Sequence, residues 1–182
     1  MKTNKNDILK IEFEEDVPIS KITTYKTDGT IKGLFSPKNE KEFIITYSFL
    51  KENNLPFIII GNGSNLLISP NANILAISTK KLRQNIQIKE NTVRFSTSIS
   101  LAKAYSLCCH NQLRGFEALA GIPATIGGAI KNNASAFGQS IFDNLEWIKI
   151  FKDGKISILK KENISFSYHS TNIKNCIILS AK

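Results

Sequence analysis

Two glycine-rich stretches contain the residue types that could hold a phosphate or a flat ring. The first, "GNGSN" at 61–65, directly follows the apolar run "PFIII". Glycine permits positive φ and lets a ligand approach the main chain, and consecutive free amides form a concave set of donors for a phosphate oxygen. Ser64 and Asn65 could add side-chain hydrogen bonds. Asn-Gly is also a strong turn signal, so a plain β-turn is the alternative for this pentapeptide.

This first stretch does not match the common nucleotide-binding loops. No lysine follows it as in the triphosphate-binding loop, and Leu66 stands where a dinucleotide-binding fingerprint needs its third glycine. A phosphate held here would therefore depend on backbone amides.

The second stretch is "GIPATIGGAIKNNASAFG", Gly121–Gly138. Pro123 can start a helical turn, and Gly127–Gly128 leave one side of that turn bare. Asn132 and Asn133 offer amide donors and acceptors that could read the edge of a heteroaromatic ring. Close packing of a helix on a strand also uses small residues, but the density of Gly, Ala, Ser and Asn favours a ligand.

The surrounding pattern predicts a mixed α+β fold in which strands position both stretches. Strands are expected at 55–60, 65–69, 73–78, 86–88, 92–98 and 176–181, with the first of these buried, and a short strand at 30–37 ends at Pro37. Ser36 should cap a helix with Pro37 at its first position, and this helix would bury Phe43, Ile44, Tyr47 and Leu50. A second helix is expected at 100–113, and 146–159 reads as a hairpin that turns at Asp153–Gly154.

Composition narrows the function classes. The formal charge of +9 could attract phosphate, but the basic residues are dispersed, and "KKLR" at 80–83 is the densest group. A basic nucleic-acid-binding domain is therefore the alternative from another class, and it is disfavoured.

The three cysteines show no metal-ligand spacing and indicate reduced thiols. Without a signal peptide or a long apolar run, we expect a cytoplasmic protein that does not span a membrane.

Four blocks of the sequence resemble the UDP-N-acetylenolpyruvoylglucosamine reductase family, also called UDP-N-acetylmuramate dehydrogenases. "TTYKTDGTIKGLFSP" resembles the family's opening "NT-x-x-x-GG" block, and "IIIGNGSNLLIS" its diphosphate loop. "LRGFEALAGIPATIGGAIKNNASAFG" resembles the long "GLE-x-x-x-GIPG-x-x-GGA-x-x-x-NAGAYG" block, which is highly specific. "FSYHSTNIKNCIILSAK" resembles the "YR-x-S" segment and the strand after it.

The resemblance implies a FAD-binding fold of the vanillyl-alcohol-oxidase type, with two small α+β subdomains that clasp the flavin. We expect a lead-in at 1–20, a first subdomain at 21–83 and a second at 84–182. The pyrophosphate would bind at 61–65, and 121–138 would line the flavin. The implied cofactor-binding residues are Gly61, Asn62, Gly63, Ser64, Asn65, Gly121, Ile122, Pro123, Thr125, Gly127, Gly128, Asn133 and Ala134.

The resemblance also implies a reaction. In the family, NADPH reduces FAD, and the flavin passes hydride to UDP-N-acetylglucosamine enolpyruvate, which gives UDP-N-acetylmuramate for peptidoglycan synthesis. Tyr168 and Ser170 match substrate-binding positions, and no metal is implied. His169 stands where the family has a catalytic arginine. A histidine can be cationic near neutral pH, but it lacks the forked guanidinium with which arginine donates two hydrogen bonds to one carboxylate.

Other departures concern glycines and a hydroxyl. Ala124 and Ser135 replace family glycines, so some backbone strain is expected if either position needs positive φ. Phe137 replaces a tyrosine and loses a hydroxyl that could contact substrate.

The family's proton-donating serine and its glutamate lie after the strand "IILSA". We therefore expect this chain to bind FAD, to lack the C-terminal substrate domain, and not to complete the reaction alone. That domain could be a separate chain or could be removed by truncation. The alternative within the same fold is an FAD-dependent oxidase or another dehydrogenase.

Overall fold

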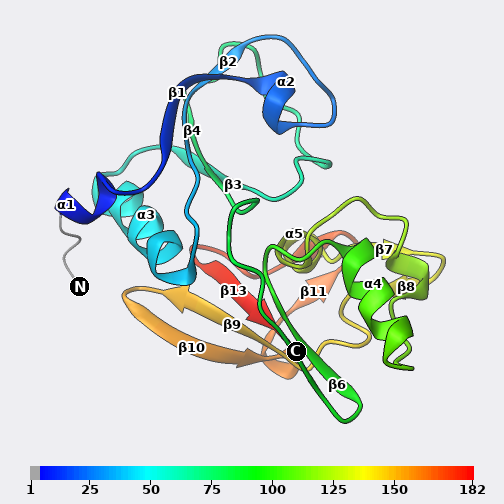
Figure 1. Cartoon of the computed structure of the whole chain (residues 1–182). Coiled ribbons are helices and arrows are strands. Elements are labelled where there is room, and N and C mark those ends of the chain that lie inside the picture. Colours follow the sequence, from blue (N-terminus) through cyan, green and yellow to red (C-terminus); the bar gives the residue numbers. More distant parts are fainter. Residues whose placement is uncertain (1–4) are drawn as a thin grey trace. The chain divides into compact units, whose positions relative to one another are not determined.

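The computed structural model describes residues 5–182, which divide into two compact units. The first unit ends at Arg83, and the second is Gln84–Lys182. Each unit combines strands with short helices (Figure 1). The predicted α+β class is confirmed.

The first unit contains a four-stranded sheet in the order β1-β2-β4-β3. β1 is antiparallel to β2, whereas β2 and β3 both run parallel to β4, so these three strands end at the same edge of the sheet. The unit contains α1 (Lys5–Ile8), β1 (Phe13–Pro18), α2 (Ile19–Ile22), β2 (Thr30–Phe35), α3 (Glu40–Glu52), β3 (Phe57–Ile60) and β4 (Leu75–Ser78). β1 and the first half of α2 therefore lie within residues 1–20, the stretch expected to be a lead-in.

α3 begins later than predicted. Asn39, and not Ser36, is its N-cap: the Asn39 side chain accepts a hydrogen bond from the Glu42 amide at 3.0 Å. The Glu42 carboxylate in turn accepts from the Lys38 amide at 2.7 Å, which gives a reciprocal arrangement like a capping box. Phe43, Tyr47 and Leu50 are buried, as the helical spacing predicted.

Two predictions about strands are wrong in the first unit. β3 is not fully buried, because it is an edge strand and Ile59 is 40% exposed. Residues 65–69 form no strand. Ile68 is nevertheless buried in the core that Val17, Ile31 and Ile60 share, so the apolar residues there pack from a loop.

The second unit contains a five-stranded antiparallel sheet in the order β10-β9-β13-β6-β5. The predicted hairpin is confirmed, with Lys152 opposite Lys155 and positive φ at Asp153 and Gly154. The sheet strands are β5 (Ile86–Lys89), β6 (Thr92–Ser96), β9 (Trp147–Lys152), β10 (Lys155–Lys160) and β13 (Ile177–Ala181).

Helices and two small hairpins complete this unit. The helices are α4 (Leu101–His110), η1 (Glu117–Leu119), α5 (Ile126–Lys131) and η2 (Lys161–Asn163). The hairpins pair β7 (Ser135–Ala136) with β8 (Gln139–Ser140), and β11 (Phe166–Ser167) with β12 (Ser170–Thr171). The helix predicted at 100–113 is confirmed as α4 but ends three residues earlier. The core of the unit includes Phe95, Leu101, Ile126, Ile130 and Ile148, all at most 3% exposed.

Among residues 5–182, no helix is long and apolar enough to cross a membrane.

Replacing the observed cap should destabilise the first unit. We expect Asn39→Ala to lower the free energy of unfolding by about 1 kcal/mol, because the Glu42 amide loses its acceptor. Chemical denaturation measures this change, and the exposed α3 residue Lys41→Ala is the control. If the two variants unfold at the same denaturant concentration, this cap does not contribute to stability.

Candidate functional site

The loop Gly61–Asn65 follows β3 at the carboxyl edge of the parallel strands. Gly63 has φ +73°, and a Cβ placed there would overlap the Ile22 carbonyl oxygen. The Gly63 carbonyl accepts a hydrogen bond from the Thr24 amide at 3.1 Å. Glycine is required at 63 because the loop packs directly on the backbone at the end of α2.

The same loop offers backbone donors. Within the part of the chain that the structure describes, the amides of Gly61, Gly63, Ser64 and Asn65 donate no hydrogen bond. In a trans peptide the N–H and C=O point in opposite directions. Since Thr24 binds the Gly63 carbonyl, the Ser64 N–H points away from Thr24. The Ser64 amide is therefore free to receive an anion.

In the second stretch, the helix begins at Ile126 and not near Pro123 as predicted. Thr125 is the N-cap, and its hydroxyl accepts a hydrogen bond from the Gly128 amide at 3.3 Å. The Thr125 side chain, only 5% exposed, therefore has a structural role.

The two central glycines of this stretch differ in their surroundings. A Cβ at Gly127 would overlap the Thr97 hydroxyl, so its small size serves the packing of α5 on the strand end. A Cβ at Gly128 would meet only the Thr125 hydroxyl oxygen at 3.4 Å, and one at Gly121 would meet nothing within 4 Å. Space for a ligand is thus found at Gly121 and Gly128, whereas Gly127 is explained by internal contact.

Asn133 connects the second stretch to the hairpin β11–β12. Its side chain is 6% exposed, its φ is +42°, and its Nδ2 donates to the Ser167 carbonyl at 2.9 Å. The Oδ1 atom is buried and has no partner among the described residues. Two of the other predicted cofactor residues, Ile122 and Ala134, pack against the core of this unit.

Tyr168 and His169 form the turn of this hairpin. Tyr168 is 81% exposed, His169 has φ +53°, and their ring centroids lie 3.9 Å apart. Ser170 begins β12. The structure therefore brings these three predicted residues together, next to the strand residue that Asn133 binds.

Two residues that attach this hairpin to α5 were not predicted. The Thr171 hydroxyl donates to the Lys131 carbonyl at 2.9 Å, and the Lys131 ammonium donates to the Ile173 carbonyl. Contacts between residues about 40 positions apart leave no local pattern that could predict them.

The strain expected at Ala124 or Ser135 is absent, since neither residue has positive φ. Positive φ falls instead on Phe137 and Gly138, which form the β7–β8 turn. Phe137 is 97% exposed, so its ring is available for contact with another molecule.

Among the described residues, no group of three His, Cys, Asp or Glu side chains could hold a metal ion.

Comparison with known proteins agrees with this geometry. The FAD binding domain family matches residues 31–159, well over half of the chain. The chain belongs to the FAD-binding domain family.

The expected FAD-binding fold is confirmed as well, because the chain superimposes on the UDP-N-acetylenolpyruvylglucosamine reductase of Thermus caldophilus with a TM-score of 0.71. That match has 22% identity and covers 95% of this chain and 61% of the other. A solvent-stable cholesterol oxidase has the same fold, with a TM-score of 0.69.

Several relatives with higher identity are named UDP-N-acetylenolpyruvoylglucosamine reductase. The enzyme of Clostridium kluyveri is 32% identical over 92% of this chain and 56% of its own length. The enzyme of Lactobacillus gasseri is 31% identical over 100% of this chain and 62% of its own length. The chain is therefore a homologue of these reductases, as the sequence blocks indicated, and it spans little more than half of their length.

Substitutions at the paired glycines should separate packing from ligand contact. In the protein without added ligand, we expect Gly127→Ala to lower the free energy of unfolding by about 1–3 kcal/mol, because its methyl group overlaps Thr97. Gly128→Ala should leave stability unchanged or slightly higher, since alanine favours helix. Denaturant unfolding of both variants measures this, and equal effects would show that the Thr97 contact does not decide the residue at 127.

Proposed function

We propose that this chain binds FAD and that the amides of Gly61–Asn65 bind its pyrophosphate. The observation that carries the proposal is the set of amides at 61 and 63–65 without partners, at the carboxyl edge of parallel strands. Ligands of open sheets with parallel strands commonly bind at this edge. Backbone amides can neutralise phosphate without a lysine, which fits the loop's composition.

In the second unit, the stretch Gly121–Gly138 is proposed to line the isoalloxazine ring. Gly121 and Gly128 leave room for a flat ring to approach the backbone. Ile122, Pro123 and Ala134 would add apolar contact, and Asn133 would hold the stretch in place through its hydrogen bond to Ser167. FAD supplies the hydride-transfer chemistry, while these residues orient the ring and exclude water from it.

We further propose that the protein takes part in the reaction for which its relatives are named: reduction of UDP-N-acetylglucosamine enolpyruvate, with NADPH as donor. This step would place it in cytoplasmic synthesis of a peptidoglycan precursor. The support is the homology over nearly the whole of this chain. Because the chain spans little more than half of these relatives, residues beyond this part would have to supply the remaining catalytic groups.

His169 and its neighbours would act on the substrate. A cationic imidazole at 169 would stabilise the negative charge that builds on the enol and carboxylate, and such stabilisation is often the largest catalytic contribution. The exposed hydroxyls of Tyr168 and Ser170 would donate hydrogen bonds to the same substrate.

A charge placed in the amide loop should weaken FAD binding. We expect Ser64→Asp to lower the affinity for FAD about tenfold or more, because the new carboxylate repels the pyrophosphate. The exposed Ser69→Asp is the matched control in the same unit and should bind FAD like the unaltered protein. Titration followed by flavin absorbance and fluorescence measures both affinities.

Riboflavin, which has no phosphate, distinguishes loss of the cradle from general damage. Ser64→Asp should leave riboflavin binding unchanged. If FAD and riboflavin bind the unaltered protein equally well, or if Ser64→Asp and Ser69→Asp have the same affinity for FAD, the loop does not bind the pyrophosphate.

The charge at 169 should affect substrate binding and leave FAD binding unchanged. In the FAD-loaded protein, we expect His169→Gln to reduce the change in flavin absorbance caused by UDP-N-acetylglucosamine enolpyruvate, and His169→Arg to restore it. UDP-N-acetylglucosamine, which lacks the enolpyruvyl carboxylate, is the control ligand. An identical response from the Gln and Arg variants would rule out a role for the charge.

A further inference from the structure

The five-stranded sheet of the second unit has β10 as one of its edges, and two isoleucines of this strand are exposed (Figure 1). Ser157 lies opposite Ile150 of β9, which is buried in the core of the unit. Because side chains alternate along a strand, Ile156 and Ile158 lie on the face opposite that core. They are 50% and 54% exposed, although the solvated face of an antiparallel sheet usually carries polar residues. Packing within the unit therefore does not explain these two isoleucines.

The backbone of β10 also has free hydrogen-bonding groups at this edge. Just after β10, the Lys161 amide donates to the Glu146 carbonyl at 2.9 Å. Bonded and non-bonded pairs alternate along antiparallel strands, so the odd-numbered residues of β10 bond to β9. The N–H and C=O groups of Ile156 and Ile158 consequently point away from β9. Among residues 5–182, these groups make no hydrogen bond to any other element.

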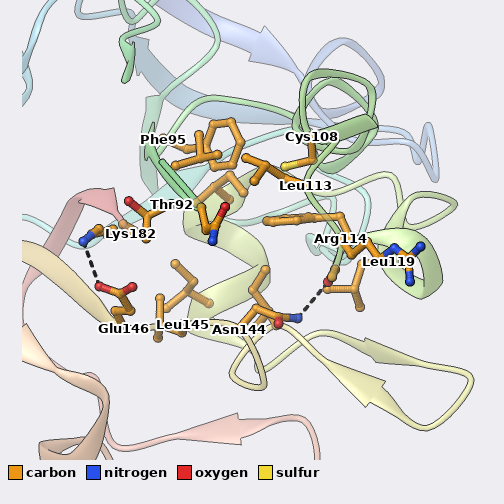
Figure 2. Close-up of a pocket in the computed structure, with 18 residues that line it drawn as sticks. Thr92, Phe95, Cys108, Leu113, Arg114, Leu119, Asn144, Leu145, Glu146 and Lys182 are labelled. Carbon is orange, nitrogen blue, oxygen red and sulfur yellow. Dashed lines mark hydrogen bonds and ion pairs between the residues drawn. The ribbon is translucent and has the colours of Figure 1, made fainter. Parts of the chain in front are cut away.

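The other side of β9 is already occupied by β13. The Lys182 amide donates to the Trp147 carbonyl at 2.9 Å, and the Trp147 amide donates to the Lys182 carbonyl at 3.4 Å. The side chains of Lys182 and Glu146 form an ion pair at 3.0 Å beside this contact (Figure 2). The open hydrogen-bonding positions of the β9–β10 hairpin therefore lie on β10.

The hairpin around this edge is basic. Residues 147–160 contain one aspartate, Asp153, and four lysines, at positions 149, 152, 155 and 160. Lys152 and Lys155 are exposed, and neither forms an ion pair within the described part of the chain. Lys160 pairs with the exposed Glu162 at 3.6 Å, a contact that contributes little. The edge therefore has positive charge that the unit does not neutralise.

This charge decides which kind of strand fits the edge. Lysines on an edge strand oppose pairing with another copy of the same strand, because the positive charges of both copies would come together. Carboxylates on an incoming strand would instead lie beside these lysines, and opposite charges across a strand pair are stabilising. Charge complementarity therefore favours an acidic strand and disfavours a second copy of β10.

We propose that β10 is a docking edge for an extended segment of another protein in which apolar residues alternate with carboxylates. The segment would add a strand to the sheet through the free backbone groups of Ile156 and Ile158. Residues directly opposite these isoleucines share their face, which suits apolar side chains, and the residues between them would lie beside Lys155. No residue of β10 is assigned to FAD or substrate, so the proposal does not depend on FAD binding.

A short end-blocked peptide of alternating glutamate and valine is the probe, titrated into the ¹⁵N-labelled chain. We expect saturable shifts of the Ile156 and Ile158 amide signals and slower hydrogen exchange at both, because these amides gain acceptors. The control is a lysine–valine peptide of the same length, which should bind about tenfold more weakly or less because its charges repel the edge.

Methylation of the peptide's own amides tests the proposed geometry. A valine opposite Ile156 or Ile158 would donate its N–H to β10, whereas the N–H of each glutamate would point away from the sheet. N-methylation of the valines should therefore abolish binding. The same modification of the glutamates is the matched control and should leave binding in place.

A charge reversal in the protein gives a second test. Lys155→Glu should weaken binding of the glutamate–valine peptide about threefold or more and should strengthen binding of the lysine–valine peptide. The exposed Lys89→Glu, on the opposite edge strand β5, makes the same change in net charge and should alter neither affinity.

Three results would overturn the proposal. The first is equal affinity for the two peptides, or no saturable binding of the glutamate–valine peptide. The second is binding that leaves the Ile156 and Ile158 amide signals unchanged. The third is protection of these amides when the protein is concentrated without peptide, since a second copy would then occupy the edge.

Discussion

The contact of Gly63 with the backbone at Ile22–Thr24 is the constraint on which the proposed cofactor site depends. It leaves no space for a side chain and fixes the Gly63 carbonyl on the Thr24 amide. The Ser64 amide is consequently directed away from that contact, and the amides of Ser64 and Asn65 have no partner among residues 5–182. Asn65 is exposed, whereas Ser64 is half-buried. A half-buried amide without a partner is costly, so an anion bound at this loop would satisfy the Ser64 amide, which the fold itself leaves free. In the binding that we propose, these amides take the place of a lysine in neutralising the pyrophosphate.

In the second unit, the residues of one glycine-rich stretch have different physical roles. Gly127 allows α5 to approach Thr97, and Thr125 caps that helix, so both positions are set by packing and hydrogen bonding. Gly121 and Gly128 leave open space. The end of the same stretch is attached to the Tyr168–His169 hairpin through Asn133 and through the Lys131 carbonyl. The position of this turn therefore depends on α5, which is why residues far apart in the sequence could serve one flavin-dependent reaction.

Much of this could be predicted from the sequence, and the failures have physical causes. The hairpin at Asp153–Gly154 and the amphipathic face of α3 follow from local turn chemistry and periodicity, and both are present. The start of α3 was misplaced because Asn39 and Glu42 form a better cap than Ser36 with Pro37. Residues 65–69 have a strand-like composition but bury Ile68 from a loop. Long-range contacts determine the roles of Thr97, Lys131 and Thr171, and a local sequence pattern cannot predict such contacts. Composition singled out both glycine-rich stretches, and the family resemblance assigned them to FAD. The structure was needed to separate the packing glycines from the open ones.

The most direct test of the account is whether the loop amides themselves respond to a pyrophosphate. ADP contains this group without the flavin and can be titrated into ¹⁵N-labelled protein while the amide NMR signals are followed. The account predicts saturable shifts at Gly61, Gly63, Ser64 and Asn65, and an absence of such shifts when adenosine replaces ADP. If FAD binds the protein but these four amide signals stay unchanged with both ADP and FAD, the pyrophosphate binds elsewhere and the central claim is wrong.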